Sequence, residues 1–198
     1  MIKRTKIGVL AFQGDVTEHV LATEHALKQL HLTGQVTPVR TKAAILKLDA
    51  LIIPGGESTV LYALCERAGM VDEMKKIPYI FGTCAGAILL SHRLKHTAPG
   101  QKTLGLMNIT VDRNAYGAQT ESFEKNILTP FGQMRSVFIR APRIVKIGPG
   151  VTKLIQDGEE ILACEQNKNG TYYLAASFHP ELTTTKIHEY FLKKVFSK

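Results

Sequence analysis

The first part of the chain alternates short apolar runs with segments of helical periodicity. Residues 7–12 form an apolar run that predicts a buried strand. A helix is predicted to begin at Asp15, where Asp15 and Glu18 resemble a capping box. The apolar face of this helix would be formed by Val16, Val20, Leu27 and Leu30.

Two more strands and a second helix are predicted in the same order. Residues 36–39 and 50–53 are strand-like, and the second run ends at Pro54. Ser58 is expected to cap the next helix and Gly69 to end it. The apolar face of that helix would be formed by Leu61, Leu64, Cys65 and Ala68. Strands that alternate with helices predict a mostly parallel sheet covered on both faces.

The remaining pattern completes the predicted fold. Residues 79–81 predict a strand, residues 82–86 a sharp turn, and residues 87–90 the start of an apolar helix. In the second half, short β-type runs predict antiparallel strands added to the sheet, at residues 137–139, 144–147, 160–164 and 172–177. A helix near residues 184–196 closes the chain. We therefore expect a three-layer α/β fold with a mixed, mostly parallel sheet, and a single domain over residues 1–198.

Composition and charge argue against several classes of protein. The 198 residues are 44% hydrophobic and 21% charged, which is typical of a globular protein. No apolar run approaches the roughly 18 residues that cross a bilayer. The N-terminus leads straight into a strand without a cleavable apolar segment, so we expect a cytoplasmic protein with no membrane partner. The net charge of +8 would suit nucleic acid, but the basic residues are scattered, and a solvated basic surface is the favoured interpretation.

The three cysteines have different settings. They are widely spaced and odd in number, which predicts neither a disulfide framework nor a zinc site. Cys65 and Cys164 lie in apolar patterns, where a free cysteine acts as a small hydrophobic residue. Cys84 differs because Gly82 and Gly86 flank it between a strand and a helix. This is the cysteine version of a nucleophile elbow, with an unusual backbone conformation and a helix start that favours thiolate. A tight turn around a buried cysteine is the alternative.

Two further motifs could serve this thiol. His179 and Glu181 are two residues apart in an extended segment, so they can share a face as a base and its orienting carboxylate. Such a pair by itself is more often a surface contact. Residues 54–58 bring glycine N–H groups between a strand and a helix, but match neither the dinucleotide nor the P-loop fingerprint. An oxyanion hole is therefore favoured over a phosphate site, with the N–H of Ala85 as a second donor.

Six other histidines lack an acidic residue two positions away. We interpret them as structural or solvated, and the role of His19 is the one that the sequence leaves open. They are His19, His25, His31, His92, His96 and His188.

Taken together, the motifs resemble those of class I (triad) glutamine amidotransferases, and more closely those of the PdxT/SNO family, the glutaminase subunits of pyridoxal 5′-phosphate synthase. The resemblance runs from residue 7 to about residue 192. The matching motifs are Phe12-Gln13-Gly14-Asp15, Pro54-Gly55-Gly56-Glu57-Ser58-Thr59, Gly82-Thr83-Cys84-Ala85-Gly86, Arg113-Asn114 with Tyr116-Gly117, Glu121-Ser122-Phe123, Phe138-Ile139-Arg140-Ala141-Pro142 and Ser177-Phe178-His179-Pro180-Glu181-Leu182. Phe12 stands where leucine is more usual in the family, and the triad and the glycine loops are unaltered.

The resemblance implies a role for each matching residue. Cys84 would form a glutamyl thioester, His179 would shuttle protons, and Glu181 would orient His179. The N–H groups of Gly56 and Ala85 would bind the oxyanion. The residues implied in glutamine binding are Gly55, Gly56, Glu57, Ser58, Arg113, Ile139 and Arg140. The sequence leaves open which arginine contacts the substrate carboxylate, and either could instead form a structural ion pair.

The resemblance also implies a partner. Ammonia would pass to a synthase subunit of (β/α)₈ type within a large hetero-oligomer, and neither metal nor cofactor would be needed. Because family glutaminases are nearly silent alone, Gln13 and Gly14 near the first strand's end are expected to sense docking. Three alternatives remain: a glutaminase for imidazole or purine synthesis, a cysteine peptidase or chaperone-like protein with a similar elbow, and a scaffold subunit that does not use its triad. The flanking motifs favour the PdxT/SNO interpretation.

Overall fold

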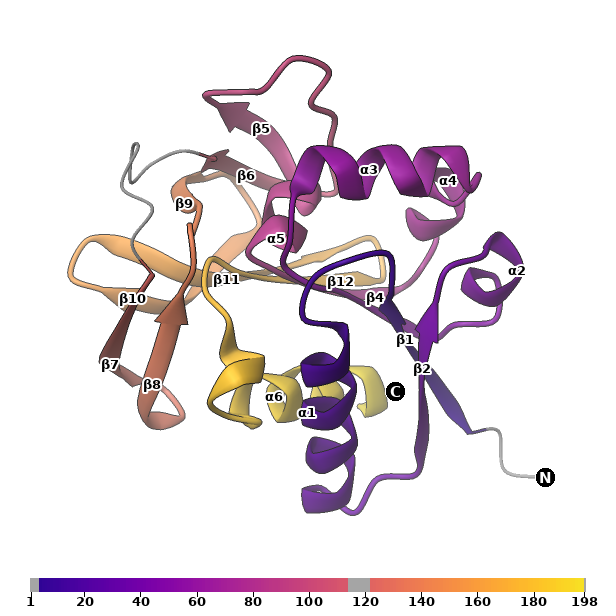
Figure 1. Cartoon of the computed structure of the whole chain (residues 1–198). Helices are drawn as coiled ribbons and strands as arrows, with labels where there is room; N and C mark the ends of the chain where they lie inside the picture. The colour runs from indigo at the N-terminus through magenta and orange to yellow at the C-terminus, as the bar shows by residue number, and fades with distance from the viewer. Residues whose placement is uncertain (1–3, 114–121, 198) are drawn as a thin grey trace.

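The computed structural model describes residues 4–113 and 122–197. Figure 1 shows the arrangement of the elements along the chain. In chain order they are β1 (Thr5–Leu10), α1 (Val16–Gln29), β2 (Gly34–Val39), α2 (Lys42–Ile45), β3 (Ala50–Ile53), α3 (Ser58–Arg67), α4 (Val71–Met74), β4 (Tyr79–Thr83), α5 (Ala85–Leu90), β5 (Ser91–Lys95), β6 (Met107–Asp112), β7 (Phe123–Thr129), β8 (Gly132–Phe138), β9 (Arg143–Ile147), β10 (Val151–Asp157), β11 (Glu160–Lys168), β12 (Thr171–Ala176), the 3₁₀ turn η1 (Pro180–Leu182) and α6 (Lys186–Phe196).

The main sheet combines a parallel part with an antiparallel part. Within the described residues it has ten strands in the order β2-β1-β3-β4-β12-β11-β9-β6-β5, with β10 paired to β11. The five strands from β2 to β12 are parallel to their neighbours. Beyond β12 the pairing is antiparallel: β12 pairs with β11, β11 with β9, and β9 with β6. At the far edge, β5 pairs parallel with β6. The prediction of a mixed, mostly parallel sheet with added antiparallel strands is confirmed.

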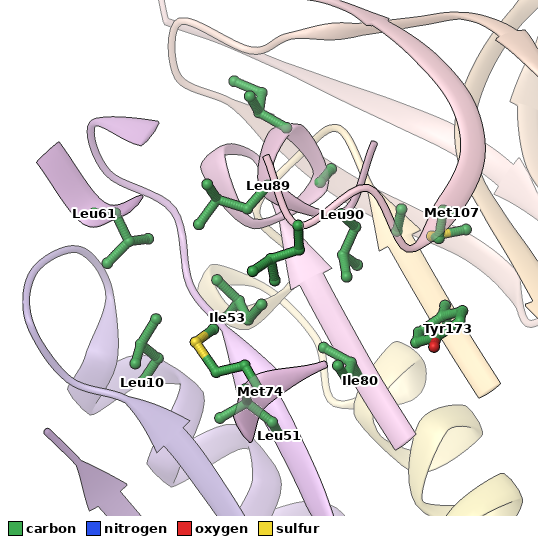
Figure 2. Packing of buried hydrophobic residues seen from close by; sticks show 14 of the residues in the cluster. Leu10, Leu51, Ile53, Leu61, Met74, Ile80, Leu89, Leu90, Met107 and Tyr173 are labelled. Atoms are coloured by element: carbon green, nitrogen blue, oxygen red, sulfur yellow. The ribbon is translucent and has the colours of Figure 1, made fainter. Parts of the chain in front are cut away.

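Helices cover both faces of the parallel part. Successive strand residues point to opposite faces of the sheet, so each face is apolar and is covered by its own group of helices. Leu51 and Ile53 pack in a cluster with α3, α4 and α5, which Figure 2 shows from close by. Ala50 and Ile52 face the other way, into a cluster with α1 and α6. In Figure 1 the two helix layers lie on opposite sides of the sheet, which confirms the three-layer prediction. No helix in the described part of the chain has the length and hydrophobicity needed to cross a membrane.

Two predicted helix caps are wrong in detail. The side chain of Glu57, rather than that of Ser58, accepts hydrogen bonds from the first turn of α3. The glutamate side chain is long enough to accept from the N–H groups of Thr59 and Val60, whereas Ser58 is itself the first residue of the helix. Asp15 is the N-cap residue of α1, but its side chain makes no capping hydrogen bond because it contacts a histidine instead.

Several strands also differ from the prediction. Residues 172–177 were grouped with the antiparallel strands, but β12 pairs parallel with β4 and extends the parallel part. Strands β5, β6, β7 and β10 were not predicted. β5, β7 and β10 have few buried residues and lack a regular apolar alternation, whereas β6 was missed although its apolar residues alternate. The β7–β8 hairpin forms a sheet of its own. The motif residues Asn114, Tyr116, Gly117 and Glu121 lie outside the described residues.

Candidate active site

The predicted site residues converge at one edge of the parallel part of the sheet. β1, β3, β4 and β12 are neighbouring parallel strands, so their carboxyl ends meet along this edge. The segments that leave these ends carry, in the same order, Gln13 to Asp15, Gly55 to Ser58, Cys84 with Ala85, and His179 with Glu181. Motifs that are far apart in the sequence therefore lie side by side.

Cys84 has the strained backbone that the elbow motif predicts. Its φ of 48° and ψ of −104° are rare for a residue with a side chain, and its N–H donates to the carbonyl of Ala176 at 2.9 Å. Both flanking glycines are needed for packing. A Cβ atom at Gly82 would lie 2.5 Å from the backbone of Gly86, and one at Gly86 would lie 2.1 Å from the carbonyl oxygen of Ile53. The start of α5 therefore packs directly against the ends of β3 and β4, and only glycine fits at these two positions.

His179 is held by two carboxylates at the same ring nitrogen. Its Nδ1 lies 2.7 Å from Glu181 Oε1 and 2.9 Å from Asp15 Oδ2. Burial opposes the charge on His179, but Asp15, Cys84 and Glu181 outweigh it and raise the pKa of His179 to about 12. Burial likewise opposes the charge on Glu181, but His19 and His179 outweigh it and hold the pKa of Glu181 below its usual range. The pair is therefore an imidazolium and a carboxylate.

The thiol and the imidazole are not joined by an ordinary hydrogen bond. His179 Nε2 is buried and has no hydrogen-bond partner among the described residues, although Cys84 contributes to the raised pKa of the ring. The Cys84 Sγ instead points to the carbonyl oxygen of Ile139 at 3.9 Å. Catalytic hydrogen bonds are often long in enzymes without substrate, so this geometry is compatible with a base that faces its nucleophile.

The glycine loop packs directly against the histidine and against the segment after β1. A Cβ atom at Gly55 would lie 2.5 Å from Cε1 of His179, and one at Gly14 would lie 2.0 Å from the carbonyl oxygen of Gly55. Gly56 has a φ of 121°, and the side chain of Gln13 donates to the carbonyl of Glu57 at 2.6 Å. The conformation of this loop is thus tied to Gln13 and Gly14.

A pocket of about 680 Å³ opens in front of these groups. This is large enough for a small polar substrate. It is lined by Gly14, Asp15, Gly56, Glu57, Ser58, Cys84, Ile88, Arg113, Ser122, Ile139, Arg140 and His179. Of the predicted site residues, Gln13, Gly55, Ala85 and Glu181 lie outside this lining.

The two arginines of the pocket have different partners. Arg113 forms an ion pair with Glu57 Oε1 at 2.5 Å, while the same carboxylate caps α3. Burial opposes the charge on Glu57, but its hydrogen bonds to the helix and the charge of Arg113 lower the pKa of Glu57. Arg140 forms no ion pair with a described residue, and its backbone has a positive φ of 45°. Of the two, Arg140 is therefore the arginine whose charge is not neutralised by a described residue.

One compact group of metal-binding residue types occurs in the part of the chain that the structure describes. The donor atoms of Asp15, His179 and Glu181 lie within 4.8 Å of one another. Both carboxylates, however, contact the same imidazole nitrogen. Because both carboxylates interact with His179 Nδ1, we interpret the group as one that orients the histidine and not as a metal site.

The other two cysteines have the structural setting that their sequence patterns indicate. Cys65 and Cys164 are both buried in the hydrophobic core, and burial raises the pKa of each thiol to about 12. They remain protonated at neutral pH, whereas Cys84 lines the pocket.

Sequence reasoning missed several side chains that surround the triad residues. Asp15 was interpreted as a helix cap and Thr83 was given no role of its own. His188 was interpreted as structural or solvated, and the role of His19 was left open. Thr83, His19 and His188 form a buried chain of contacts behind Glu181. One signal was present for two of them. Asp15 and His19 are four residues apart at the start of a helix, so both can face the carboxyl end of the neighbouring strands.

Comparisons with known proteins point to one family. A model described as the SNO glutamine amidotransferase family matches residues 9–197. Pyridoxal 5′-phosphate synthase subunit PdxT of Pyrococcus furiosus is 42% identical over 199 residues, covering 96% of this chain and 98% of the relative. The subunit of that name from Saccharolobus islandicus is also 42% identical, over 203 residues, with the same coverage.

Solved structures show the same relationship. A crystal structure of a glutamine amidotransferase has a TM-score of 0.81 and 41% identity, and the match covers 96% of this chain and 98% of the other. A GH42 β-galactosidase matches with a TM-score of 0.59 but only 9% identity, which shows a likeness of fold alone. The chain therefore belongs to the SNO glutamine amidotransferase family.

Proposed function

We propose that this chain hydrolyses L-glutamine to L-glutamate and ammonia with Cys84 as nucleophile, His179 as proton carrier and Glu181 as its orienting carboxylate. The ammonia would serve a pyridoxal 5′-phosphate synthase, as the name of the PdxT relatives suggests. One observation carries the assignment of residues: the elbow thiol lines the same pocket as His179, whose Nδ1 is paired with the buried Glu181. Domain boundaries of 1–198 and a cytoplasmic location are part of the same proposal.

The first half of the reaction uses the protonated imidazole. The Cys84 thiolate attacks the side-chain amide carbon of glutamine, and the carbonyl oxygen becomes an oxyanion that the N–H groups of Gly56 and Ala85 stabilise. His179 then gives its Nε2 proton to the amide nitrogen, the C–N bond breaks, and ammonia leaves a glutamyl thioester. A histidine whose pKa is raised to about 12 begins this step in the protonated form that it needs.

The second half restores the enzyme. Neutral His179 takes a proton from water, the hydroxide attacks the thioester carbon, and a second oxyanion forms at the same donors. The C–S bond breaks, glutamate leaves, and Cys84 is again a thiolate beside an imidazolium. Atoms and charges balance over the two steps without a metal or a cofactor.

Glutamine would be held at the front of the pocket. Arg140 is proposed to bind the α-carboxylate, because it forms no ion pair with the described residues. Glu57 and the carbonyl of Ile139 are proposed to face the ammonium group. Arg113 would act through its ion pair with Glu57, which fixes that carboxylate at the start of α3. Gly55, Gly56 and Ser58 complete the proposed substrate site.

The proposed partner is a (β/α)₈ synthase subunit in a large hetero-oligomer. Gln13 and Gly14 are the proposed sensors of docking, since both contact the glycine loop that supplies the Gly56 N–H. Gly14 packs so closely against the carbonyl of Gly55 that a Cβ atom would not fit between them, and the Gln13 side chain donates a hydrogen bond to the carbonyl of Glu57. Movement of either residue would therefore move the loop. The net charge of +8 would favour an acidic face on the partner.

Ammonia release with and without the synthase subunit tests this proposal. We expect glutamine turnover to rise sharply when the subunit is added, and Cys84→Ala to abolish it without a change in melting temperature. Cys164→Ala is the matched control, because it removes a buried thiol that does not line the pocket. Ammonia release that persists in Cys84→Ala would contradict the mechanism, and full activity without the partner would contradict the docking requirement.

A further inference from the structure

Behind Glu181, three further polar side chains continue the line of contacts into the core. His19 Nε2 lies 2.9 Å from Thr83 Oγ1 and 3.4 Å from Glu181 Oε2, and His19 Nδ1 lies 3.0 Å from His188 Nε2. His19, Thr83 and His188 are all fully buried. A buried polar group costs free energy unless it is paired, so a chain of three needs a reason to exist in this position.

The fold explains how these residues meet. Phe81 on β4 faces the cluster beneath α1 and α6, and Thr83 lies two positions later on the same face. α1 brings His19 and α6 brings His188 to this space. The Phe81 ring lies edge-on to both imidazoles, at 6.1 Å and 5.4 Å between ring centres, and closes the site from the sheet side.

The positions of the hydrogen atoms follow from the partners. If His19 carries its proton on Nε2, this N–H can donate to Thr83 and point toward Glu181 Oε2. His19 Nδ1 is then an acceptor, so His188 must donate to it from Nε2. The atom left over is His188 Nδ1, which is buried without a hydrogen-bond partner among the described residues. In this arrangement that atom is a bare acceptor.

The other arrangements are worse. With the proton on His19 Nδ1, the lone pair of His19 Nε2 would face the Glu181 carboxylate at 3.4 Å. His188 would then accept at Nε2 and carry an unpaired N–H at its buried Nδ1. A doubly protonated His19 requires the same unpaired N–H on His188. Buried N–H groups without a partner are rarer than buried acceptors without one.

Neutral His188 agrees with its surroundings. Burial, the largest cause, lowers the pKa of His188 to about 3, and the carboxylate of Glu181 acts in the opposite direction. His188 therefore does not compete for a proton at neutral pH, and it can serve as a fixed donor to His19.

We propose that His19, held in its Nε2–H tautomer by His188, is a positioning residue that directs the Glu181 carboxylate toward His179. Glu181 Oε1 contacts His179 and Oε2 faces His19, so the two oxygens are assigned to two different histidines. Glu181 Oε2 is buried without a hydrogen-bond partner among the described residues, and His19 Nε2, at 3.4 Å, is the polar group that faces it. Without His19, the buried carboxylate can rotate or take up a proton. The base would then lose the orientation on which both proton transfers depend. This inference rests on the proposed function.

Kinetics of two His19 variants with the synthase subunit form the first part of the test. In His19→Leu we expect kcat to fall about 10- to 100-fold, as when the partner that orients a functional histidine is removed, with KM unchanged within about twofold. His19→Gln keeps an N–H donor near the Nε2 position and should recover most of the loss. His25→Leu, on the exposed side of the same helix, should have no effect.

Nitrogen-15 NMR of histidine-labelled wild-type protein forms the second part and needs no activity. We expect His19 and His188 each to carry a proton on Nε2, and His188 to carry none on Nδ1. A proton on His188 Nδ1, or a folded His19→Leu enzyme with wild-type kcat, would overturn the inference. Should His19→Leu not fold, the tautomers and the His19→Gln kinetics decide the question. A wild-type complex that does not hydrolyse glutamine would contradict the proposed function alone, since the tautomers are measured independently.

Discussion

The rear and the front of the site are built from different parts of the fold. The rear comprises buried side chains from β4, α1, α6 and the segment after β12, namely Thr83, His19, His188, His179 and Glu181. The front comprises residues that follow β6 and β8 and remain at least partly exposed, namely Arg113, Ile139 and Arg140. Groups that move protons need fixed positions and little water, whereas groups that admit a substrate must be reachable. The comparison predicts that substitutions at the rear of the site lower kcat, whereas substitutions at the front raise KM.

The largest expected effect comes from removing the proton carrier at the rear. In His179→Asn, the amide nitrogen can occupy the position of Nδ1 and keep contact with Glu181, but the proton on Nε2 is lost. We expect kcat for glutamine hydrolysis to fall about 10⁴-fold with little change in KM. His92→Asn, at an exposed histidine, is the control. A large rise in KM with a preserved kcat would show that the rear also binds substrate.

The next largest effect is expected on stability, at Gly86 in the turn that carries Cys84. In Gly86→Ala the new methyl group would lie 2.1 Å from the carbonyl oxygen of Ile53. We expect a loss of about 3 kcal/mol in the free energy of unfolding, measured by urea denaturation, together with low activity. Gly69→Ala is the matched control because its φ is 64° and no atom lies within 4 Å of the added Cβ. It should lose only about 1–2 kcal/mol, from backbone strain alone. Equal losses in both variants would contradict the steric argument.

The sequence predicted the local parts of this arrangement better than the distant ones. The elbow at Cys84 and the spacing of His179 and Glu181 are short motifs whose geometry depends on neighbouring residues. His19 and His188 are 169 positions apart, and nothing in the local pattern of either helix indicates that their rings meet. Asp15 was misinterpreted because a helix start favours an acidic residue in any case, so capping concealed its contact with His179.

A smaller effect is expected at the front. Arg140→Gln removes a charge that no described acidic residue neutralises. If this charge binds the substrate carboxylate, its loss is worth about 1.5–3 kcal/mol, which corresponds to a rise in KM of roughly 10- to 150-fold. We expect kcat to change little. Arg135→Gln provides the control, because the exposed side chain of Arg135 pairs with Glu124 across the β7–β8 hairpin. A fall in kcat at constant KM would place Arg140 with the rear of the site.

The smallest effect is expected where the two regions meet, at Asp15. Its side chain is 31% exposed toward the pocket, yet it contacts His179 Nδ1. Asp15→Asn removes one of the two carboxylates that raise the pKa of His179, so this pKa should fall below the wild-type value of about 12. Because Glu181 remains, we expect only a several-fold loss of kcat, far less than in His179→Asn. The titration of His179 by NMR gives the direct measurement.

The stability of the Asp15→Asn variant should depend on pH in a defined way. A histidine with a raised pKa in the folded state stabilises the fold fully below its unfolded pKa of about 6.5, and this contribution is lost as pH rises toward 12. The variant should therefore be less stable than wild type near pH 6. The difference should shrink only once the pH exceeds the lowered pKa of His179 in the variant and approaches the wild-type value of about 12. Glu18→Gln, in the first turn of the same helix but exposed, should show no such convergence. A difference that does not shrink as the pH approaches 12 would mean that Asp15 acts on the helix and not on the imidazolium.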